Sequence, residues 1–342
     1  MHYDEIITEG LNSLRKANVP ERWLDIGAET QHGNKLNREY IESITFEMRL
    51  LGSTFADTTS SIFGVRLPAP IMPATFMHGR VWDKMVQSGI WNERSSFSFT
   101  GDYLEDIAAG VADAQSIAWI GADNESESVA RMIESGVKVV LIVKPLKNKE
   151  KVKSLMKWGE KLGCVAVGID VDSMFYEKAF DESEVPSYHG PQSIDDLKSY
   201  KRSLSVPFII KGILSAHDAK IAKDQVEADS IVVSSHGGES IDYAVPILKV
   251  LPEIREAAGK DMTMIVDSGF RRGTDALKAL ALGANGVSYG SLLVLAFAAY
   301  GRLGIATMLK ILYAELKRVM SHTGCEDIAS IDPGILRFKY GR

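Results

Sequence analysis

The stretch Ser230-Ile-Val-Val-Ser-Ser-His-Gly-Gly-Glu239 is an apolar, β-branched run that ends in a histidine and two glycines. A strand of a parallel sheet is covered on both faces and reads as a near-continuous apolar run. In α/β barrels the residues just past the C-terminal end of a strand usually carry the chemistry. The stretch therefore predicts a buried strand that delivers His236 to a loop, and His236 is the candidate catalytic base.

Similar apolar runs alternate with amphipathic helical stretches along most of the chain, which is typical of βα units in a parallel sheet. The predicted strands are 69–75, 115–123, 137–144, 164–170, 207–213, 230–235, 262–268 and 286–290. Eight such units close naturally into a barrel. The predicted fold class is therefore α/β, a (β/α)8 TIM barrel with an N-terminal helical extension.

The segments outside the strands complete a predicted single domain of residues 1–342. Residues 1–45 form the helical extension, in which Ile6, Leu11 and Leu14 have helical spacing and Pro20 opens a second helix. The barrel and its closing helices occupy 69–320, with one or two packed helices over 292–319, and 321–342 is a polar tail. Two long loops, 78–101 and 172–193, follow strand ends and are either lids over the active face or ordinary surface insertions.

Composition limits the function classes. With 45% hydrophobic and 25% charged residues the chain is typical of a globular protein, and its net charge of -6 disfavours nucleic acid or an anionic membrane as a partner. Cys164 and Cys325 lack the spacing of a metal or disulfide framework, so no metal is expected. The N-terminus lacks signal-peptide features, and the longest apolar run, 292–300, is too short to span a bilayer. We expect a cytoplasmic protein with a small-molecule substrate.

Several other strand ends carry residues suited to chemistry. Lys211 lies inside an apolar run, and a buried lysine requires an anion or an electron-rich acceptor. Asp170 ends the fourth strand and is the predicted partner of His236, whose tautomer such a carboxylate fixes. The loops after strands seven and eight carry Gly269, Arg271 and Gly290, a combination that favours a phosphate.

These motifs together resemble the FMN-dependent 2-hydroxy acid oxidase and dehydrogenase family. The motifs that carry the resemblance are Val206-Pro-Phe-Ile-Ile-Lys-Gly-Ile-Leu214, Ser234-Ser-His-Gly-Gly238, Asp267-Ser-Gly-Phe-Arg-Arg-Gly-Thr-Asp-Ala-Leu-Lys-Ala-Leu-Ala-Leu-Gly-Ala284 and Thr323-Gly-Cys325. Upstream, Pro70-Ile-Met-Pro-Ala-Thr-Phe-Met77 looks like the first flavin-contacting strand of the family, and residues 45–64 resemble the segment before it.

The resemblance implies FMN as the cofactor and a catalytic set of His236, Asp170 and Lys211. Lys211 would stabilise reduced, anionic FMN, and His236 would take a proton from the substrate with Asp170 behind it. The implied cofactor-binding residues are Pro73, Ala74, Thr75, Lys211, Ser234, Asp267, Gly269, Arg271, Gly290 and Ser291. Members of the family are often tetramers, so the resemblance also implies a homo-oligomer.

The substrate end departs from the family pattern. Glu239 stands where the family has an arginine that grips the substrate carboxylate, and Glu177 aligns with a second arginine. Lys144 and Trp23 replace tyrosines, and Ser291 replaces an arginine beside the phosphate. The expected substrate-binding residues are Trp23, Lys144, Glu177, His236 and Glu239.

We therefore expect an FMN-dependent oxidoreductase that oxidises a CH–OH or CH–NH₂ group on a substrate other than a simple 2-hydroxy acid. The first alternative is a conventional 2-hydroxy acid dehydrogenase or oxidase whose substrate carboxylate is held by Lys144. The second is a flavin-binding subunit without turnover.

Overall fold

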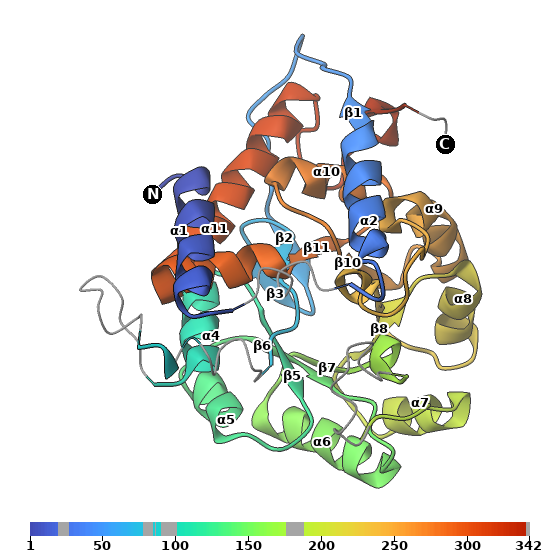
Figure 1. Ribbon diagram of the computed structural model, residues 1–342. Helices are drawn as coiled ribbons and strands as arrows, with labels where there is room; N and C mark the ends of the chain where they lie inside the picture. Colours follow the sequence, from blue (N-terminus) through green and yellow to red (C-terminus); the bar gives the residue numbers. More distant parts are fainter. Residues whose placement is uncertain (20–26, 78–84, 86, 90–100, 176–187, 340–342) are drawn as a thin grey trace.

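A sheet of parallel strands forms the centre of the computed structural model, which describes residues 1–342 except 20–26, 78–84, 86, 90–100, 176–187 and 340–342 (Figure 1). The strand order is β4-β11-β10-β9-β8-β7-β6-β5. The strands are β4 (Ile71–Pro73), β5 (Ala118–Ala122), β6 (Val139–Val143), β7 (Ala166–Asp170), β8 (Phe208–Ile213), β9 (Ser230–Val233), β10 (Thr263–Val266) and β11 (Gly286–Tyr289). Each lies within one predicted run, so all of the predicted strands are confirmed.

The sheet closes between its first and last members. Phe76, just after β4, forms a parallel bridge with Ile120 of β5. The Phe76 N–H donates to the Trp119 carbonyl at 2.9 Å, and the Gly121 N–H donates to the Phe76 carbonyl at 2.6 Å. The predicted (β/α)8 barrel is therefore correct, and all eight strands point their C-terminal ends at one mouth.

Alternate strand residues fill the barrel interior, as the two-residue period of a strand requires. Val140 and Ile142 of β6 pack inside, together with Trp119 of β5. A hairpin of β2 (Ser60–Ile62) and β3 (Val65–Leu67) adds Ile62 and Leu67 to this interior cluster. The hairpin was not predicted, because two three-residue strands carry too short a pattern to recognise.

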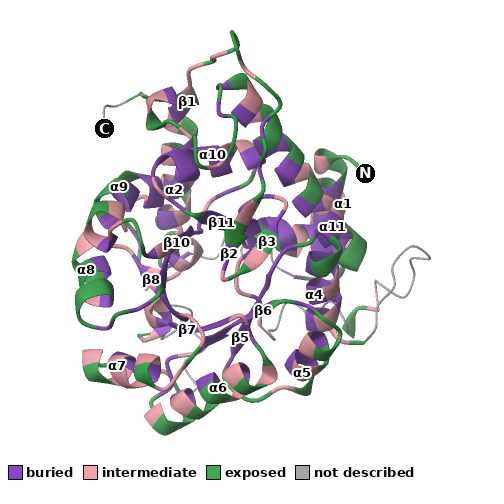
Figure 2. Cartoon of the chain, turned by 180° about the vertical axis from the view of Figure 1, so that it is seen from behind, coloured by how far each residue is buried: buried purple, intermediate pink, exposed green. Residues whose placement is uncertain are grey.

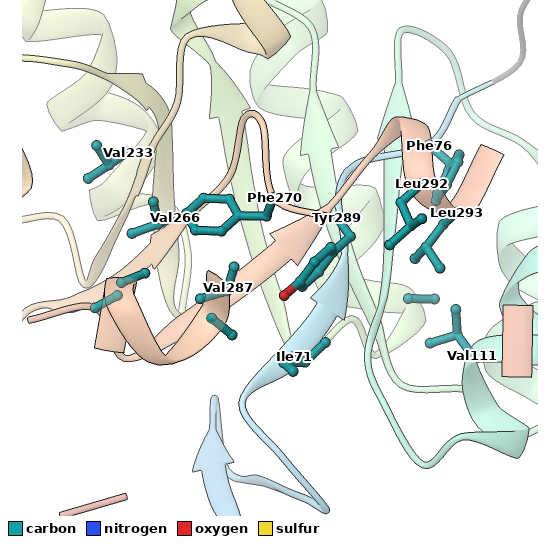
Figure 3. Packing of buried hydrophobic residues seen from close by; sticks show 14 of the residues in the cluster. Ile71, Phe76, Val111, Val233, Val266, Phe270, Val287, Tyr289, Leu292 and Leu293 are labelled. Atoms are coloured by element: carbon teal, nitrogen blue, oxygen red, sulfur yellow. The ribbon is translucent and has the colours of Figure 1, made fainter. Parts of the chain in front are cut away.

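Helices surround the barrel and turn their buried sides toward it (Figure 2). They are α4 (Tyr103–Asp113), α5 (Glu127–Glu134), α6 (Lys149–Leu162), α7 (Ile194–Arg202), α8 (Ala216–Asp224), α9 (Ile247–Ala258), α10 (Gly273–Ala281) and α11 (Ser291–His322). Figure 3 shows Val266 of β10 and Val287 of β11 beside Phe270 in this outer layer. The rings of Phe270 and Tyr289 lie 6.2 Å apart, so the loop after β10 is packed onto β11.

The N-terminal extension and the C-terminal tail pack against the barrel and against each other. Helix α1 (Tyr3–Lys16) buries Ile6 and Leu14 and packs on α11, while α2 (His32–Ser43) leads into β1 (Ile44–Phe46). After η4 (Pro333–Ile335), β12 (Leu336–Phe338) pairs antiparallel with β1. The segment predicted as a polar tail, 321–342, therefore includes a short strand that pairs with the N-terminal extension. The helix predicted from Pro20 begins outside the described residues.

Helix α11 unites the one or two helices predicted after the last strand. It is kinked where Tyr300 and Gly301 leave the helical conformation. Among the described residues it is the one helix long and apolar enough to cross a membrane, but 67% of its most apolar stretch is buried inside the protein. Its apolar character is therefore explained by packing on α1, α4 and α10.

Candidate active site

The predicted catalytic residues meet at the C-terminal mouth of the barrel. Asp170 ends β7, Lys211 lies in β8, and His236 begins η3 (His236–Gly238) just after β9. Because neighbouring parallel strands end at the same edge, these side chains come together from separate parts of the sequence. Lys211 and Asp170 are almost fully buried, whereas the His236 side chain is 27% exposed and can reach a ligand in the mouth.

A turn with an unusual backbone presents His236. His236, Gly237 and Gly238 have φ values of +52°, +68° and +91°, so three successive residues are left-handed. Glycine adopts this conformation freely, but a histidine there is strained, and such strain is common at functional sites. The Ser268 hydroxyl accepts from the N–H groups of Ser235 and Gly237 at 3.2 and 3.1 Å and braces the turn. Ser268 was missed by sequence reasoning.

The carboxylate that bonds His236 is Asp172 and not the predicted Asp170. His236 Nδ1 lies 2.8 Å from Asp172 Oδ1 but 3.7 Å from Asp170 Oδ1. Asp170 instead accepts hydrogen bonds from two lysines, Lys211 at 2.9 Å and Lys144 at 2.5 Å. The expectation that Asp170 stands directly behind the imidazole is therefore corrected.

The charged side chains form one continuous chain from β6 to the β9 turn. Lys211 Nζ bridges Asp170 and Asp172, at 2.9 and 3.2 Å, and lies 3.4 Å from His236 Nδ1. Burial favours neutral Asp170, but Lys144, Lys211 and His236 outweigh it and hold the pKa of Asp170 well below its usual value. Burial likewise favours neutral Lys211, yet Asp170, Asp172 and Asp267 raise its pKa. Along the hydrogen-bonded chain of Lys144, Asp170, Lys211 and Asp172, two ammonium groups therefore face two carboxylates.

The protonation of His236 follows from the same neighbours. Burial and the positive charge of Lys211 lower the pKa of His236, but the charges of Asp172 and Asp170, and the hydrogen bond that His236 donates to Asp172, outweigh them. The net effect raises the pKa of His236 above its ordinary value. A raised pKa makes the neutral imidazole a stronger base.

The carboxylates and His236 also have the ligand types of a metal site. One ligand atom each from Asp170, Asp172 and His236 lies within 4.8 Å of the others. Lys211 Nζ already bonds both carboxylates. The ammonium group is therefore the cation that this cluster holds, and the expectation of no bound metal stays a prediction.

The end of β4 has an unsatisfied polar group that suits a cofactor. Thr75 Oγ1 is buried and has no hydrogen-bond partner among the described residues. The preceding Ala74 N–H donates to the Tyr289 carbonyl at 2.9 Å, which ties this segment to β11. A buried hydroxyl without a partner is costly, so its presence at the barrel mouth fits a polar ligand such as the edge of a flavin ring.

The predicted phosphate residues lie at the ends of β10 and β11. Gly269 has φ +87°, Arg271 is exposed, and Gly290 with Ser291 begins helix α11. Main-chain N–H groups at a helix start and a nearby exposed arginine are suitable phosphate ligands. Arg272 is different, because it binds the Glu315 carboxylate and lies 3.9 Å over the ring of Tyr3.

The donor set of the mouth fits FMN. Thr75, Lys211 and Ser234 would face the ring system, and Gly269, Arg271 and the start of α11 would face the phosphate. Pro73, at the end of β4, would lie beside the ring. Asp267, at the end of β10, accepts a hydrogen bond from the Ser268 hydroxyl at 2.8 Å. Burial raises the pKa of Asp267, although Lys211, Ser234 and Ser268 act in the opposite direction.

Replacing Thr75 with valine tests this fit. Valine has nearly the same shape and removes the orphan hydroxyl, so the free energy of unfolding of the FMN-free protein should stay equal or rise. FMN affinity should fall about 5- to 10-fold, because a neutral hydrogen bond contributes about 1 kcal/mol. Isothermal titration with FMN and urea denaturation measure the two effects. A more stable protein with unchanged FMN affinity would show that Thr75 does not contact the flavin.

The predicted substrate residues are only partly described. Trp23 and Glu177 lie outside the described residues, as do most of the two long loops. Glu239 is half-buried just beyond the His236 turn, and Lys144 stands at the end of β6 with 12% of its side chain exposed. The structure therefore brings Lys144 to the catalytic cluster. Asp172 was missed as a partner because it begins the predicted loop 172–193, where the sequence gives no sign of a side chain's direction.

The chain is similar to known FMN-dependent proteins. The family model for FMN-dependent dehydrogenases matches residues 179–338. Glycolate oxidase 1 of Zea mays is 28% identical over 357 residues, covering 93% of this chain and 92% of the relative. An L-lactate dehydrogenase of Caulobacter vibrioides is 40% identical over 141 residues, which cover 41% of this chain and 37% of the relative.

Solved structures extend the similarity over nearly the whole fold. Mandelate oxidase is 26% identical with a TM-score of 0.79, and 97% of this chain and 98% of that chain are covered. A mandelate oxidase variant that carries an FMN adduct has a TM-score of 0.78 at 26% identity, with 93% of this chain and 95% of that chain covered. The chain is therefore similar over nearly its whole length to FMN-dependent 2-hydroxy acid oxidases and dehydrogenases, and FMN is its cofactor.

Proposed function

We propose that this FMN-dependent oxidoreductase converts a 2-hydroxy acid to the corresponding 2-oxo acid. The observation that carries the proposal is His236, held by a carboxylate at 2.8 Å in the barrel mouth beside Lys211. The similar proteins named glycolate oxidase, lactate dehydrogenase and mandelate oxidase support the same substrate class. They favour the conventional alternative over the first expectation of an unusual or amine substrate.

His236 and Lys211 have different roles in this oxidation. The reaction removes two electrons and two protons from the hydroxyl-bearing carbon and its oxygen. FMN, when bound, supplies the two-electron acceptor. His236 uses Nε2, the ring nitrogen opposite its bond to Asp172, to accept a proton from the substrate. Lys211 places a buried positive charge in the site where negative charge develops.

Lys144 is the residue best placed to bind the substrate carboxylate. Its ammonium group has three donors, one of which reaches Asp170, and its side chain remains 12% exposed at the mouth. Glu239, just past the His236 turn that follows β9, adds a negative charge on the other side of the mouth from β6. A substrate carboxylate would therefore be drawn toward β6 and away from Glu239.

Replacing Lys144 with methionine should raise KM for 2-hydroxy acids about 10- to 100-fold and change kcat less. A charged hydrogen bond contributes about 1.5–3 kcal/mol, and about 1.4 kcal/mol is tenfold in affinity. Lys144→Arg should recover most of the affinity, and Lys147→Met, on the exposed side of the same segment, should have no effect. Equal losses in kcat and in kcat/KM would instead mean that Lys144 acts only on the reacting atoms.

The proposal as a whole is tested by anaerobic bleaching of the bound flavin. Lactate, glycolate and mandelate are compared with L-amino acids and primary amines at equal concentrations. Bleaching by at least one hydroxy acid supports the proposal. Bleaching by amines alone would restore the first expectation, and an unbleached flavin with every compound would support a flavin-binding subunit.

The assembly and the location of the protein remain proposals. A homo-oligomer follows from the family resemblance, and a cytoplasmic location follows from composition alone. Sedimentation of the purified holoenzyme and fractionation of the source cells would test them.

A further inference from the structure

We propose that Asp172 is the residue that positions the base, by holding His236 in the one tautomer that can accept a proton from the substrate. This inference rests on the proposed function of His236 and assigns a role to a carboxylate that sequence reasoning passed over. Asp170, which the family resemblance gave as the partner, is left with a separate task, because it neutralises Lys144 and Lys211.

The fold builds a defined place for Asp172. Directly after β7 the chain makes the single turn of η2 (Val171–Ser173), and the buried Ser173 hydroxyl donates to the Asp170 carbonyl at 3.0 Å. This turn directs the Asp172 side chain over β8 and leaves it 5% exposed. The direction is therefore fixed by backbone structure and not by the side chain alone.

Gly212 makes the room for this side chain. A Cβ atom at Gly212 would lie 2.6 Å from both the Cβ and the backbone N of Asp172. The backbone of Gly212 is also left-handed, with φ +102°, and the β8–β9 register shifts between Lys211 and Ile213. The glycine of the Lys-Gly-Ile stretch is thus explained by the carboxylate that lies against it.

The two nearest polar neighbours of His236 Nδ1 decide the tautomer. Asp172 Oδ1, at 2.8 Å, can only accept a hydrogen bond, so it requires a proton on Nδ1. Lys211 Nζ, at 3.4 Å, can only donate, so it would require a lone pair there. The shorter contact belongs to Asp172, and Lys211 has closer acceptors in Asp170 and Asp172. Nδ1 therefore carries the proton and Nε2 keeps its lone pair.

Removal of Asp172 should move the imidazole proton of His236 from Nδ1 to Nε2. In Asp172→Ala the nearest polar group left at Nδ1 is the ammonium group of Lys211, at 3.4 Å, while Asp170 Oδ1 lies farther away, at 3.7 Å, and is occupied by Lys211. The ammonium group favours a lone pair on Nδ1 and moves the proton to Nε2. The ring would then present an N–H to the substrate and could not act as the base. A residue that merely filled space would leave the tautomer unchanged when replaced.

Nitrogen-15 NMR of the holoenzyme labelled at its seven histidines tests the proposal directly. The His236 signals are identified by their loss in His236→Asn. We expect Nδ1–H in the wild type and Nε2–H in Asp172→Ala, with flavin reduction by the active hydroxy acid slowed about 10²–10⁴-fold, the contribution of a positioned base. Asp195→Ala, on the exposed side of α7, is the control and should behave as wild type.

A second variant covers the case in which Asp172→Ala does not fold. Asp172→Asn keeps the volume and an accepting oxygen but loses the charge. The tautomer should persist, while the pH at which His236 titrates should fall and the rising limb of the pH–rate profile should move with it. An unchanged titration in Asp172→Asn, or Nδ1–H retained in Asp172→Ala, would overturn the proposal.

The readouts separate this inference from the proposed function. If the NMR changes occur as expected but no 2-hydroxy acid bleaches the flavin, the proposed function fails and the positioning role stands. If hydroxy acids bleach the flavin and Asp170→Asn alone changes the His236 tautomer, the function stands and Asp170 is the positioning residue.

Discussion

Replacing His236 with asparagine should slow substrate-dependent flavin reduction by about 10²–10⁴-fold, the usual contribution of a positioned general base. FMN should remain bound, because the predicted cofactor contacts come mainly from β4, β8, β10 and the start of α11. Stopped-flow reduction with the best hydroxy acid measures the rate, and the absorbance ratio of flavin to protein measures occupancy.

The pH dependence of the wild type provides a further check on His236. The base must be neutral to accept a proton, so the rate should rise with pH through the raised pKa of His236. His217→Asn is the matched control, since this histidine is 79% exposed on α8 and bonds only its neighbour Asp218 among the described contacts. Wild-type reduction rates in His236→Asn would assign the base to another group.

Replacing Lys211 with methionine should lower the free energy of unfolding by about 3–5 kcal/mol. The change leaves Asp172 without its cation and Asp170 with only Lys144, and breaking a buried ion pair from one side leaves uncompensated charge. Urea denaturation of the FMN-free protein at pH 7 measures the loss. Lys201→Met, which removes a more exposed lysine from Asp229, should cost less than about 1 kcal/mol.

The sign of the pH effect distinguishes charge from lost packing. In the wild type the pKa of Asp170 is lower in the folded protein than in the unfolded chain, so ionised Asp170 stabilises the fold at pH values above its unfolded-state pKa. This stabilisation is lost as the pH falls toward the folded-state pKa. In Lys211→Met the carboxylates become easier to protonate, so the difference in unfolding free energy from wild type should narrow as the pH falls below about 5. A gap that is constant with pH would attribute the loss to packing.

The barrel could be predicted from the sequence because strands such as β6 and β9 are buried on both sides and consist of apolar, β-branched residues. Because His236, Lys211 and Asp170 lie at or near the ends of predicted strands, the sequence also predicted that they meet at one mouth of the barrel. The three-residue strands β2, β3, β1 and β12 were missed, since their stability comes from long-range pairing and not from a local pattern.

The detail of the base could not be predicted in the same way. Asp170 and Asp172 differ by two positions, and in an extended strand both would point to the same side. The turn of η2 begins between them and separates their roles, so that Asp172 reaches His236 and Asp170 reaches the lysines. A preference for one carboxylate over the other depends on this single turn, whose geometry a sequence pattern does not specify.

The pairing of β1 with β12 has a consequence for how the chain is made. Residues 44–46 are synthesised early, but their partner strand is residues 336–338, close to the end of the chain. At about 5–20 residues per second, ribosomes need roughly 15–60 s to make the intervening length. During that interval β1 is on a nascent chain whose partner strand does not yet exist, and α1 likewise waits for α11. The extension that begins the sequence is therefore among the last parts of the protein to reach its final structure.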